Sequence, residues 1–365
     1  MIAVLLACRP PDAEPAPPAE PESAAEVFDR LAAPGPYSVG YREDQLEWVD
    51  SSTGSRENRL AVWWPSDDTT GAEARYWRGA VPAGPGVFAE ATVAAGPHRV
   101  AVFSHGHQGY AENSSFLAEH FASWGFVVVA PDHTGNTTID GGERTTEIYL
   151  QRPGDVSAAL DWVLDPADAV RASVDPADPV LLGHSFGGYT GFASLGATYD
   201  PAVLADCPNH LDDPYCSTLD AAMTARFEAG LREERWAAGV LMAAGDFDKF
   251  GAAGADAVSP PLLLMGGGLD PGGDGSEYWG ALAAGTDRHW LRIDGAGHQS
   301  FTDFAGILED FDGLMPAEAG FAVINAYALA ALLAAGGDAS VAPLLSTFPG
   351  PFPGATLAGS APGSG

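Results

Sequence analysis

The sequence predicts one domain of the α/β class, with a mostly parallel central sheet and helices on both of its faces. Continuously apolar runs recur between residues 99 and 293, and stretches with helical spacing separate several of them. Such runs are typical of strands that are buried on both faces. Of the 365 residues, 46% are hydrophobic, which is enough for one large core. We therefore expect a single folded domain over residues 35–345.

The first strands are expected ahead of the alternating region. Residues 37–65 read as two extended strands around a turn at 51–54, and the second strand ends at Pro65. The two ends of the chain are rich in proline and small residues. We expect residues 1–34 to be a signal followed by a disordered linker, and residues 346–365 to be a disordered tail.

From residue 99 onward, strands and helices alternate. Buried strands are expected at 100–103, 126–132, 180–183, 238–243, 262–265 and 289–293, with helices at 115–124 and 154–164. The apolar run Phe321–Ala335 is interrupted by Asn325, so we expect a buried helix there and not a membrane span. The polar segment 196–235 breaks the alternation and is predicted to be an inserted lid.

The chain is strongly acidic, with a formal net charge of −32 and Lys249 as its only lysine. A surface of this charge repels phosphate backbones and anionic headgroups, so nucleic acid is not an expected partner. A solvated acidic surface is the simplest interpretation. The alternatives are repulsion of acidic substrates and attraction of cationic ones.

The first eight residues end in Leu-Leu-Ala-Cys and precede a tract of proline, alanine and glutamate. This segment resembles the lipobox of bacterial lipoproteins, in which the cysteine, here Cys8, is lipidated. The resemblance implies an exported protein, either a cell-envelope lipoprotein that meets the membrane only through its anchor or a secreted protein. The hydrophobic stretch is short and has no basic residues before it, so the sequence leaves open whether Met1 is the true start.

The other two cysteines lie close together in a polar loop. In an exported protein, Cys207 and Cys216 are expected to form a disulfide. The alternative is a metal site that they share with His210, although the spacing matches no common zinc pattern.

A candidate nucleophile lies between a predicted strand and a predicted helix. Residues 183–187 read GHSFG and fit the Gly-x-Ser-x-Gly pattern of the sharp turn that exposes the serine of α/β-hydrolases. The glycines let the strand and the helix approach closely, and the helix N-terminus favours a developing oxyanion. We therefore expect Ser185 to be a nucleophile.

A serine hydroxyl needs an adjacent base and a group that orients this base. His298 follows the last predicted strand in a loop of small residues, and Asp270 leaves the preceding strand, in the chain order Ser, acid, His. We expect His298 to be the general base and Asp270 the orienting acid. The competing carboxylates are those of Asp246, Asp248 and Asp274.

An oxyanion hole needs two backbone N–H groups. One is expected from Phe186, directly after the serine, and the other from His107, in the loop after the strand at 100–103. The alternative, a metal site formed by His105 and His107, has no carboxylate or cysteine cluster to support it. No cofactor or metal is expected.

Several of these segments together resemble the platelet-activating-factor acetylhydrolases and their bacterial relatives among dienelactone-hydrolase-like and polyester-hydrolase-like enzymes. The resemblance covers roughly residues 35–335 and rests on GPYSVG at 35–40, VWWP at 62–65, FSHG at 103–106, GHSFGG at 183–188 and GHQSFTDF at 297–304. In the acetylhydrolases the acid occupies the position of Ala243. Asp270 instead matches the acid of the polyester hydrolases. The resemblance therefore supports the catalytic mechanism more strongly than it supports a lipid substrate.

The resemblance implies a serine esterase that acts through an acyl-enzyme, on short-chain acyl esters or acetylated phospholipid-like molecules. A second hypothesis is a hydrolase of polyesters or cutin, with Tyr110, Phe247 and Trp279 lining an aromatic groove. A third is a non-catalytic surface binding protein on a hydrolase scaffold. The oligomeric state is left open.

Overall fold

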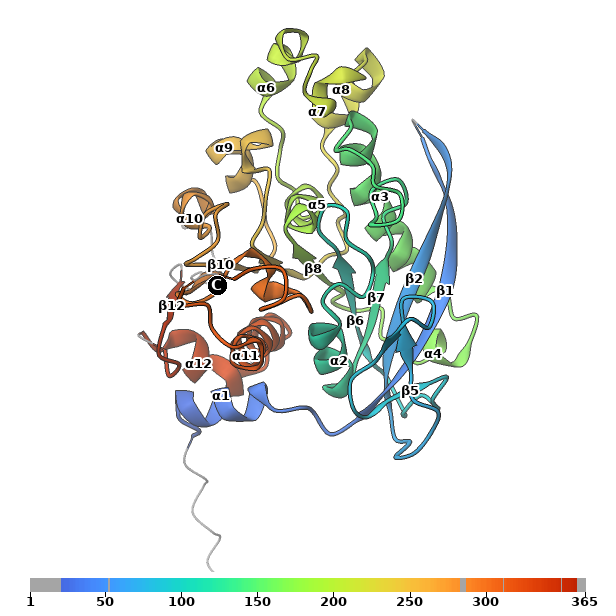
Figure 1. Ribbon diagram of the computed structural model, residues 1–365, viewed down its shortest axis with the longest axis vertical. Coiled ribbons are helices and arrows are strands. Elements are labelled where there is room, and N and C mark those ends of the chain that lie inside the picture. Colours follow the sequence, from blue (N-terminus) through green and yellow to red (C-terminus); the bar gives the residue numbers. More distant parts are fainter. Residues whose placement is uncertain (1–20, 52, 283–286, 311, 349, 360–365) are drawn as a thin grey trace, which may run out of the picture.

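A computed structural model describes residues 21–51, 53–282, 287–310, 312–348 and 350–359. The expected lipidation site, Cys8, lies outside these residues. A ten-stranded sheet runs through the described molecule, in the order β12-β11-β10-β9-β8-β6-β7-β2-β1-β5 (Figure 1).

The centre of the sheet is parallel. Six neighbouring strands pair in parallel there. In spatial order they are β7 (Phe126–Pro131), β6 (Arg99–Ser104), β8 (Val180–His184), β9 (Ala238–Met242), β10 (Leu262–Gly267) and β11 (Arg288–Ile293). On one side, β2 (Gly54–Ser66) and β1 (Ser38–Asp50) add an antiparallel pair, and the short β5 (Val87–Ala89) completes this edge. The predicted α/β class and mostly parallel sheet are confirmed, as is the opening pair of strands. A small hairpin of β3 (Arg75–Tyr76) and β4 (Val81–Pro82) lies outside the main sheet.

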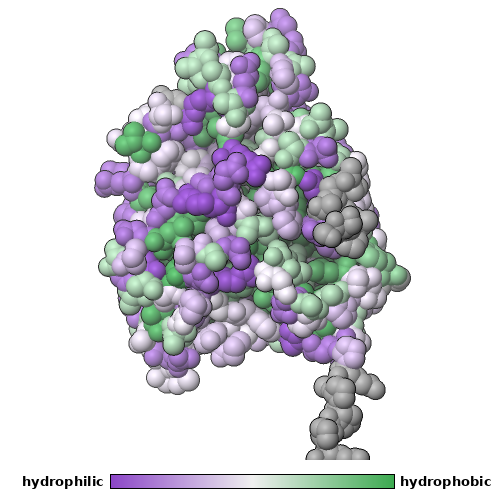
Figure 2. Space-filling view, turned by 180° about the vertical axis from the view of Figure 1, so that it is seen from behind, coloured by the Kyte–Doolittle hydropathy of each residue, from purple (hydrophilic) through white to green (hydrophobic). Residues whose placement is uncertain are grey.

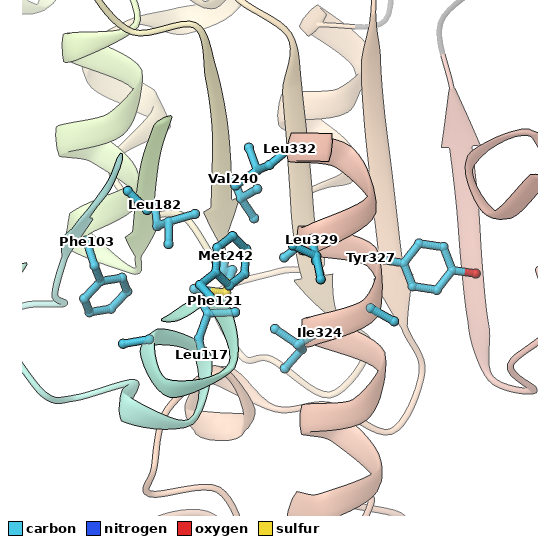
Figure 3. Close-up of a cluster of buried hydrophobic side chains, with 14 of the residues drawn as sticks. Phe103, Leu117, Phe121, Leu182, Val240, Met242, Ile324, Tyr327, Leu329 and Leu332 are labelled. Carbon is cyan, nitrogen blue, oxygen red and sulfur yellow. The ribbon is translucent and has the colours of Figure 1, made fainter. Parts of the chain in front are cut away.

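Helices cover both faces of the sheet. The helices α2 (Ser115–Ser123), α11 (Ala317–Ala335) and α12 (Ala342–Ser346) share one apolar core, and α3 (Thr146–Leu164), α5 (Phe186–Ser194), α9 (Gly251–Asp256) and α10 (Ser276–Leu282) share the other. A short helix, α4 (Ala169–Ala172), precedes β8. Strand residues alternate between the cores: Leu182 faces the α11 side (Figure 3), and Leu181 faces the α5 side. This alternation buries both faces of the central strands and explains their unbroken apolar runs.

The helix α11 matches the predicted buried helix. Its 19 residues are long and apolar enough to cross a bilayer by length and composition alone. Val323, Ile324 and Leu329 are nevertheless fully buried, and α11 lies against the sheet (Figure 3). It is therefore the core helix of this domain. On the face shown in Figure 2, hydrophilic and apolar side chains are interspersed over most of the surface.

Two segments that the sequence predicted to be disordered are ordered. Residues Ala24–Ala32 form α1, which begins with a capping box between Ser23 and Glu26 and buries Val27 and Leu31 completely. At the other end, β12 (Ala355–Gly359) pairs antiparallel with β11. Both predictions were wrong because each segment is short and adjoins a proline-rich or glycine-rich stretch of the chain, and because its partner lies far away in the sequence.

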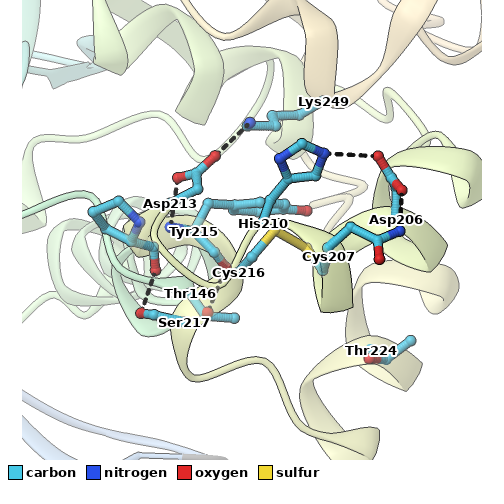
Figure 4. Close-up of a disulfide and its surroundings, with 12 residues drawn as sticks. Thr146, Asp206, Cys207, His210, Asp213, Tyr215, Cys216, Ser217, Thr224 and Lys249 are labelled. Carbon is cyan, nitrogen blue, oxygen red and sulfur yellow. Dashed lines mark hydrogen bonds and ion pairs between the residues drawn. A yellow bond between two sulfur atoms is a disulfide. The ribbon is translucent and has the colours of Figure 1, made fainter.

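The inserted segment 196–235 contains α6 (Pro201–Asp206), α7 (Pro214–Ser217) and α8 (Ala221–Ala229) (Figure 1). The predicted disulfide between Cys207 and Cys216 is present, with 5.0 Å between the Cα atoms (Figure 4). His210 instead bonds Asp206, and no group of metal ligands occurs among the described residues. The segment packs beside α3, where Thr146 donates to the carbonyl of Tyr215.

Candidate active site

Ser185 lies at the turn between β8 and α5. Its backbone adopts φ +56° and ψ −116°, a conformation that is costly for a residue with a side chain. The amide of Ser185 donates to the carbonyl of Met242, which holds the turn against β9. A Cβ atom on Gly187 would clash with the carbonyl of Ser104, and one on Gly183 would clash with Gly187. The two glycines of the motif are therefore required by close packing of the strand, the turn and the helix.

His298 joins Ser185 to Asp270. Its Nε2 lies 2.8 Å from the Oγ of Ser185, and its Nδ1 lies 2.8 Å from Oδ2 of Asp270. The side chain of Asp270 is 3% exposed, whereas that of His298 is 28% exposed. Each residue follows the carboxyl end of a parallel strand: β8 for the serine, β10 for the aspartate and β11 for the histidine. The topology thus brings together three side chains that lie far apart in the sequence.

The competing carboxylates are engaged elsewhere. Asp246 accepts hydrogen bonds from Arg144 and from the hydroxyl of Tyr149. Asp274 accepts from Arg292, and Asp248 pairs with Lys249. Among the four candidates, Asp270 alone is hydrogen-bonded to the imidazole of His298.

Two cavities meet at His298. One, of about 410 Å³, is lined by Ser185 and His298 together with His107, Arg144, Phe304 and Leu308. The other, of about 360 Å³, lies on the Asp270 side and is lined by Asp246, Phe247, Glu277 and Tyr278. No residue of the inserted segment 196–235 lines either cavity. The serine hydroxyl is therefore reached through the first cavity.

The loop after β6 passes directly over the serine. A Cβ atom added to Gly106 would lie 3.2 Å from the Cβ of Ser185, so the backbone of this loop is in contact with the turn. His107 follows in the same loop and lines the serine cavity, and Phe186 begins α5. The backbones of both expected oxyanion donors thus lie beside Ser185.

The side chain of Arg152, on α3, is hydrogen-bonded to the loop after β6. The guanidinium is completely buried and donates to the carbonyl of His105, and its Nη1 donates to Oδ1 of Asn136 at 3.0 Å. The Nδ2 of Asn136 then donates to Nδ1 of His107 at 2.9 Å. Burial lowers the pKa of Arg152 to about 9. A continuous chain of hydrogen bonds therefore runs from α3 to the ring of His107.

A second Ser-His-Asp chain anchors the same loop. The Oγ of Ser104 lies 2.8 Å from Nε2 of His133, whose Nδ1 lies 2.9 Å from Oδ2 of Asp155. All three residues are fully buried, and Arg56 binds Asp155 through two nitrogens at 2.9 Å. Burial lowers the pKa of His133 far below its usual value, so the ring is neutral. With no exposed atoms, this chain supports the fold and is closed to substrate.

Sequence reasoning missed this buried network. Its members lie at the carboxyl ends of β6 and β7 and on one face of α3: Ser104, His133, Asn136, Arg152 and Asp155. Polar residues directly after buried strands, together with Arg152 and Asp155 three positions apart on one helix, were the available signal.

Comparison with solved structures agrees with this architecture. A ferulic acid esterase from Streptomyces cinnamoneus superposes with a TM-score of 0.58 and 23% identity, over 83% of this chain and 91% of that one. The chain has the α/β-hydrolase fold. Within this fold, the carboxyl edge of the sheet is where the loops that carry Ser185, Asp270 and His298 meet.

Sequence comparisons match parts of this chain. The chlorophyllase family profile matches residues 79–202, about a third of the chain. Two cutinases, est2 from Thermobifida alba and cutinase 2 from Thermobifida cellulosilytica, are 38% and 36% identical over 86 residues, which is 23% of this chain. The matched region spans only 26% and 29% of those two proteins.

The three aromatic residues expected to line a groove are dispersed. Tyr110 contacts the rings of Trp77 and Phe304, and it lines a cavity of about 320 Å³ next to that of the serine. Phe247 lines the cavity on the Asp270 side. Trp279 packs against the core on the α5 side and lines none of these three cavities. The three residues therefore do not form one groove.

Proposed function

We propose that this protein is a serine hydrolase that cleaves carboxylic esters through an acyl-enzyme. The observation that carries the proposal is the imidazole of His298, which bridges the hydroxyl of Ser185 and the carboxylate of Asp270 at 2.8 Å on each side. The names of the similar proteins, cutinases and a ferulic acid esterase, support ester hydrolysis as the reaction class.

In this mechanism, Nε2 of His298 accepts the proton of Ser185 as Oγ attacks the ester carbonyl. The negative charge develops on the former carbonyl oxygen, where the N–H groups of Phe186 and His107 stabilise it. His298 then donates its proton to the departing alcohol. A water molecule, deprotonated by His298, then attacks the acyl-enzyme. The protonated imidazole, which Asp270 keeps oriented, returns this proton to Oγ of Ser185 as the acyl–oxygen bond breaks and the acid is released.

The proposal is tested with purified protein and p-nitrophenyl acetate. We expect turnover well above the spontaneous rate without any added metal or cofactor. A folded, correctly processed protein with no activity on p-nitrophenyl esters of two to twelve carbons would contradict it. Short acyl chains, including acetyl groups on phospholipid-like molecules, are the primary substrate class that we propose.

A second candidate function is hydrolysis of extended apolar esters such as polyesters or cutin. An apolar track leads away from the serine cavity: Phe304 lines both that cavity and the neighbouring one, which also contains Tyr110 and Val81. Leu308 and Ile307 border the track and are 62% and 72% exposed. Exposed apolar side chains that gather beside a catalytic cleft favour a large hydrophobic substrate.

We expect Leu308→Ser to separate these two functions. If the track binds substrate, kcat/KM for p-nitrophenyl dodecanoate should fall about fivefold or more, because covering the exposed side chain of a leucine with the acyl chain is worth about 1–2 kcal/mol. The rate on p-nitrophenyl acetate should be nearly unchanged. The matched control is Val49→Ser, since Val49 is 72% exposed and lines none of the described cavities. Equal losses on both esters would rule out the track as a binding surface.

The buried network leads to a further expectation about the oxyanion hole. Asn136→Ala should lower kcat on p-nitrophenyl acetate about tenfold to a hundredfold with little change in KM, because His107 loses its hydrogen-bonded support. Affinity for a boronic acid, which mimics the tetrahedral intermediate, should fall by the same factor. Asn209→Ala, in the exposed part of the insert, serves as the control. An unchanged kcat would show that Asn136 does not position the loop.

We also propose that the protein is exported. The disulfide between Cys207 and Cys216 supports this, because such bonds persist in oxidising compartments. Lipidation at Cys8 is the form of export that the N-terminal sequence favours.

A further inference from the structure

The cavity of Ser185 differs in charge from the rest of the molecule. Aspartate and glutamate outnumber lysine and arginine by 49 to 17 in the chain. No aspartate or glutamate is among the described residues that line this cavity, and Arg144 is the only lysine or arginine among them. The cavity on the other side of His298 has the opposite character, because four carboxylates line it: those of Asp246, Asp248, Asp270 and Glu277. The serine cavity is thus a positively charged site in a strongly acidic protein.

Arg144 is held beside the two residues that are expected to form the oxyanion hole. Its guanidinium carbon lies 4.8 Å from the centre of the Phe186 ring. Burial is the main cause that lowers the pKa of His107, and the positive charge of Arg144 is the next. The guanidinium therefore lies close to Phe186 and to His107, on the side of the cavity where the ester carbonyl is expected to bind.

One edge of this guanidinium is free to bind a ligand. Its Nη1 donates to both carboxylate oxygens of Asp246, at 3.0 and 2.8 Å. The Nε and Nη2 atoms have no hydrogen-bond partner in the described part of the chain, and neither of them is a fully buried atom. The side chain of Arg144 is 37% exposed. The N–H groups of Nε and Nη2 lie in one plane and match two oxygens of a carboxylate or phosphate.

The negative charge of Asp246 does not cancel this site. The carboxylate of Asp246 is 9% exposed, and it accepts hydrogen bonds from Tyr149 as well as from Arg144. Its oxygens are therefore covered, whereas the free edge of Arg144 is accessible. The net charge of the molecule repels anions at long range, but salt screens this repulsion beyond about 8 Å at physiological ionic strength. Contact with the guanidinium then decides whether an anion binds.

The inference deepens the proposed ester hydrolysis and depends on it for the substrate. A short acyl group fills little of a cavity of about 410 Å³, so most of this space is left for the alcohol part of the ester. The neighbouring cavity, with its four carboxylates, is unfavourable for an anion. We propose that Arg144 determines specificity by binding a carboxylate or phosphate group on the alcohol part of a short-chain ester.

The test compares three acetate esters that differ in one group. The anionic esters are 4-acetoxybenzoate and 4-acetoxyphenyl phosphate, and the neutral one is 4-acetoxybenzamide. We expect Arg144→Gln to lower the ratio of kcat/KM for an anionic ester to that for the neutral ester at least tenfold, because a charge-assisted hydrogen-bonded pair is lost. Comparison of ratios between proteins cancels the intrinsic reactivity of each ester. A fall for only one of the two anions would assign the site to that class of alcohol.

Two further variants make the test independent of folding effects. Arg144→Gln leaves Asp246 without its ion pair, so the double variant Arg144→Gln/Asp246→Asn removes both charges and should show the same fall in the ratio. Arg232→Gln is the matched control, since Arg232 is 41% exposed, pairs with Glu234 and lines neither cavity. The control should keep the wild-type ratios. Equal losses on all three esters would assign Arg144 a purely structural role and would overturn the proposal.

A binding measurement separates this proposal from the proposed function. Calorimetry with the Ser185→Ala protein, which should not cleave the ester, measures its affinity for 4-acetoxybenzoate. We expect this affinity to fall at least tenfold when Arg144→Gln is added. Unchanged ratios and an unchanged affinity would overturn the role of Arg144 even if the protein hydrolyses all three esters. Binding that depends on Arg144, without hydrolysis of any ester by the wild-type protein, would support the anion site and contradict ester hydrolysis instead.

Discussion

Ser185→Ala is expected to reduce kcat/KM for p-nitrophenyl acetate on the order of 10⁴-fold or more. The hydroxyl is the only group of the site that can form the acyl bond, and its distance of 2.8 Å from Nε2 of His298 is suited to proton transfer. Removal of the Oγ atom leaves the oxyanion donors and the cavity in place, so substrate binding should be retained. Steady-state kinetics with the purified variant measures the loss.

The variant should fold like the wild-type protein. The backbone of Ser185 already adopts positive φ, and alanine is no larger than serine, so a Tm within about 2 °C of wild type is expected. His298→Ala should cause a similar loss, and the double variant should be no worse than either single one, because the two residues act as a unit. A folded Ser185→Ala protein with the wild-type rate would remove Ser185 from the mechanism.

Asp155→Ala is expected to lower the free energy of unfolding by about 3–5 kcal/mol. The carboxylate is completely buried and accepts hydrogen bonds from Arg56, Trp48 and His133. Its removal leaves the guanidinium of Arg56 without its bidentate partner and frees Ser104 and His133 from their anchor. Urea unfolding at neutral pH measures the loss of stability.

The matched control lies on the same helix. Asp161→Ala removes a carboxylate that is 68% exposed and pairs with Arg235 at the surface, so its cost should stay below about 1 kcal/mol. Because Ser104 is the last residue of β6, directly before the loop that carries His107, Asp155→Ala should also lower esterase activity in the protein that remains folded. A loss of stability no larger than that of the control would show that the buried network is not a structural anchor.

The features that were predicted correctly are those that depend on the local sequence. The apolar runs predict the central strands because burial on both faces leaves no polar position. The GHSFG motif predicts the position of Ser185 because a strained turn between strand and helix needs its glycines locally. His298 and Asp270 could be proposed from their place after predicted strands, since parallel strands end at one edge.

Other features depend on contacts between segments far apart in the sequence, even where a local signal is present, such as the Ser23–Glu26 capping box at the start of α1. The helix α1 is stabilised by burial of Val27 and Leu31 beneath α11 and α12, almost 300 residues away in the sequence. β12 exists because β11 offers it an open edge. Asp246 was a competing candidate because it also follows a strand, and only the three-dimensional structure shows that it pairs with Arg144 and Tyr149.

Labelling with a fluorophosphonate probe, followed by peptide mass spectrometry, decides whether Ser185 is the nucleophile, because the probe reacts only with an activated serine. We expect one adduct per chain, on Ser185, with loss of esterase activity in proportion to labelling and strongly reduced labelling in His298→Ala. The buried Ser104 should remain unmodified despite its own histidine and aspartate. Ester hydrolysis that persists after full labelling of Ser185, or an adduct on another serine that abolishes hydrolysis, would rule out Ser185 as the nucleophile.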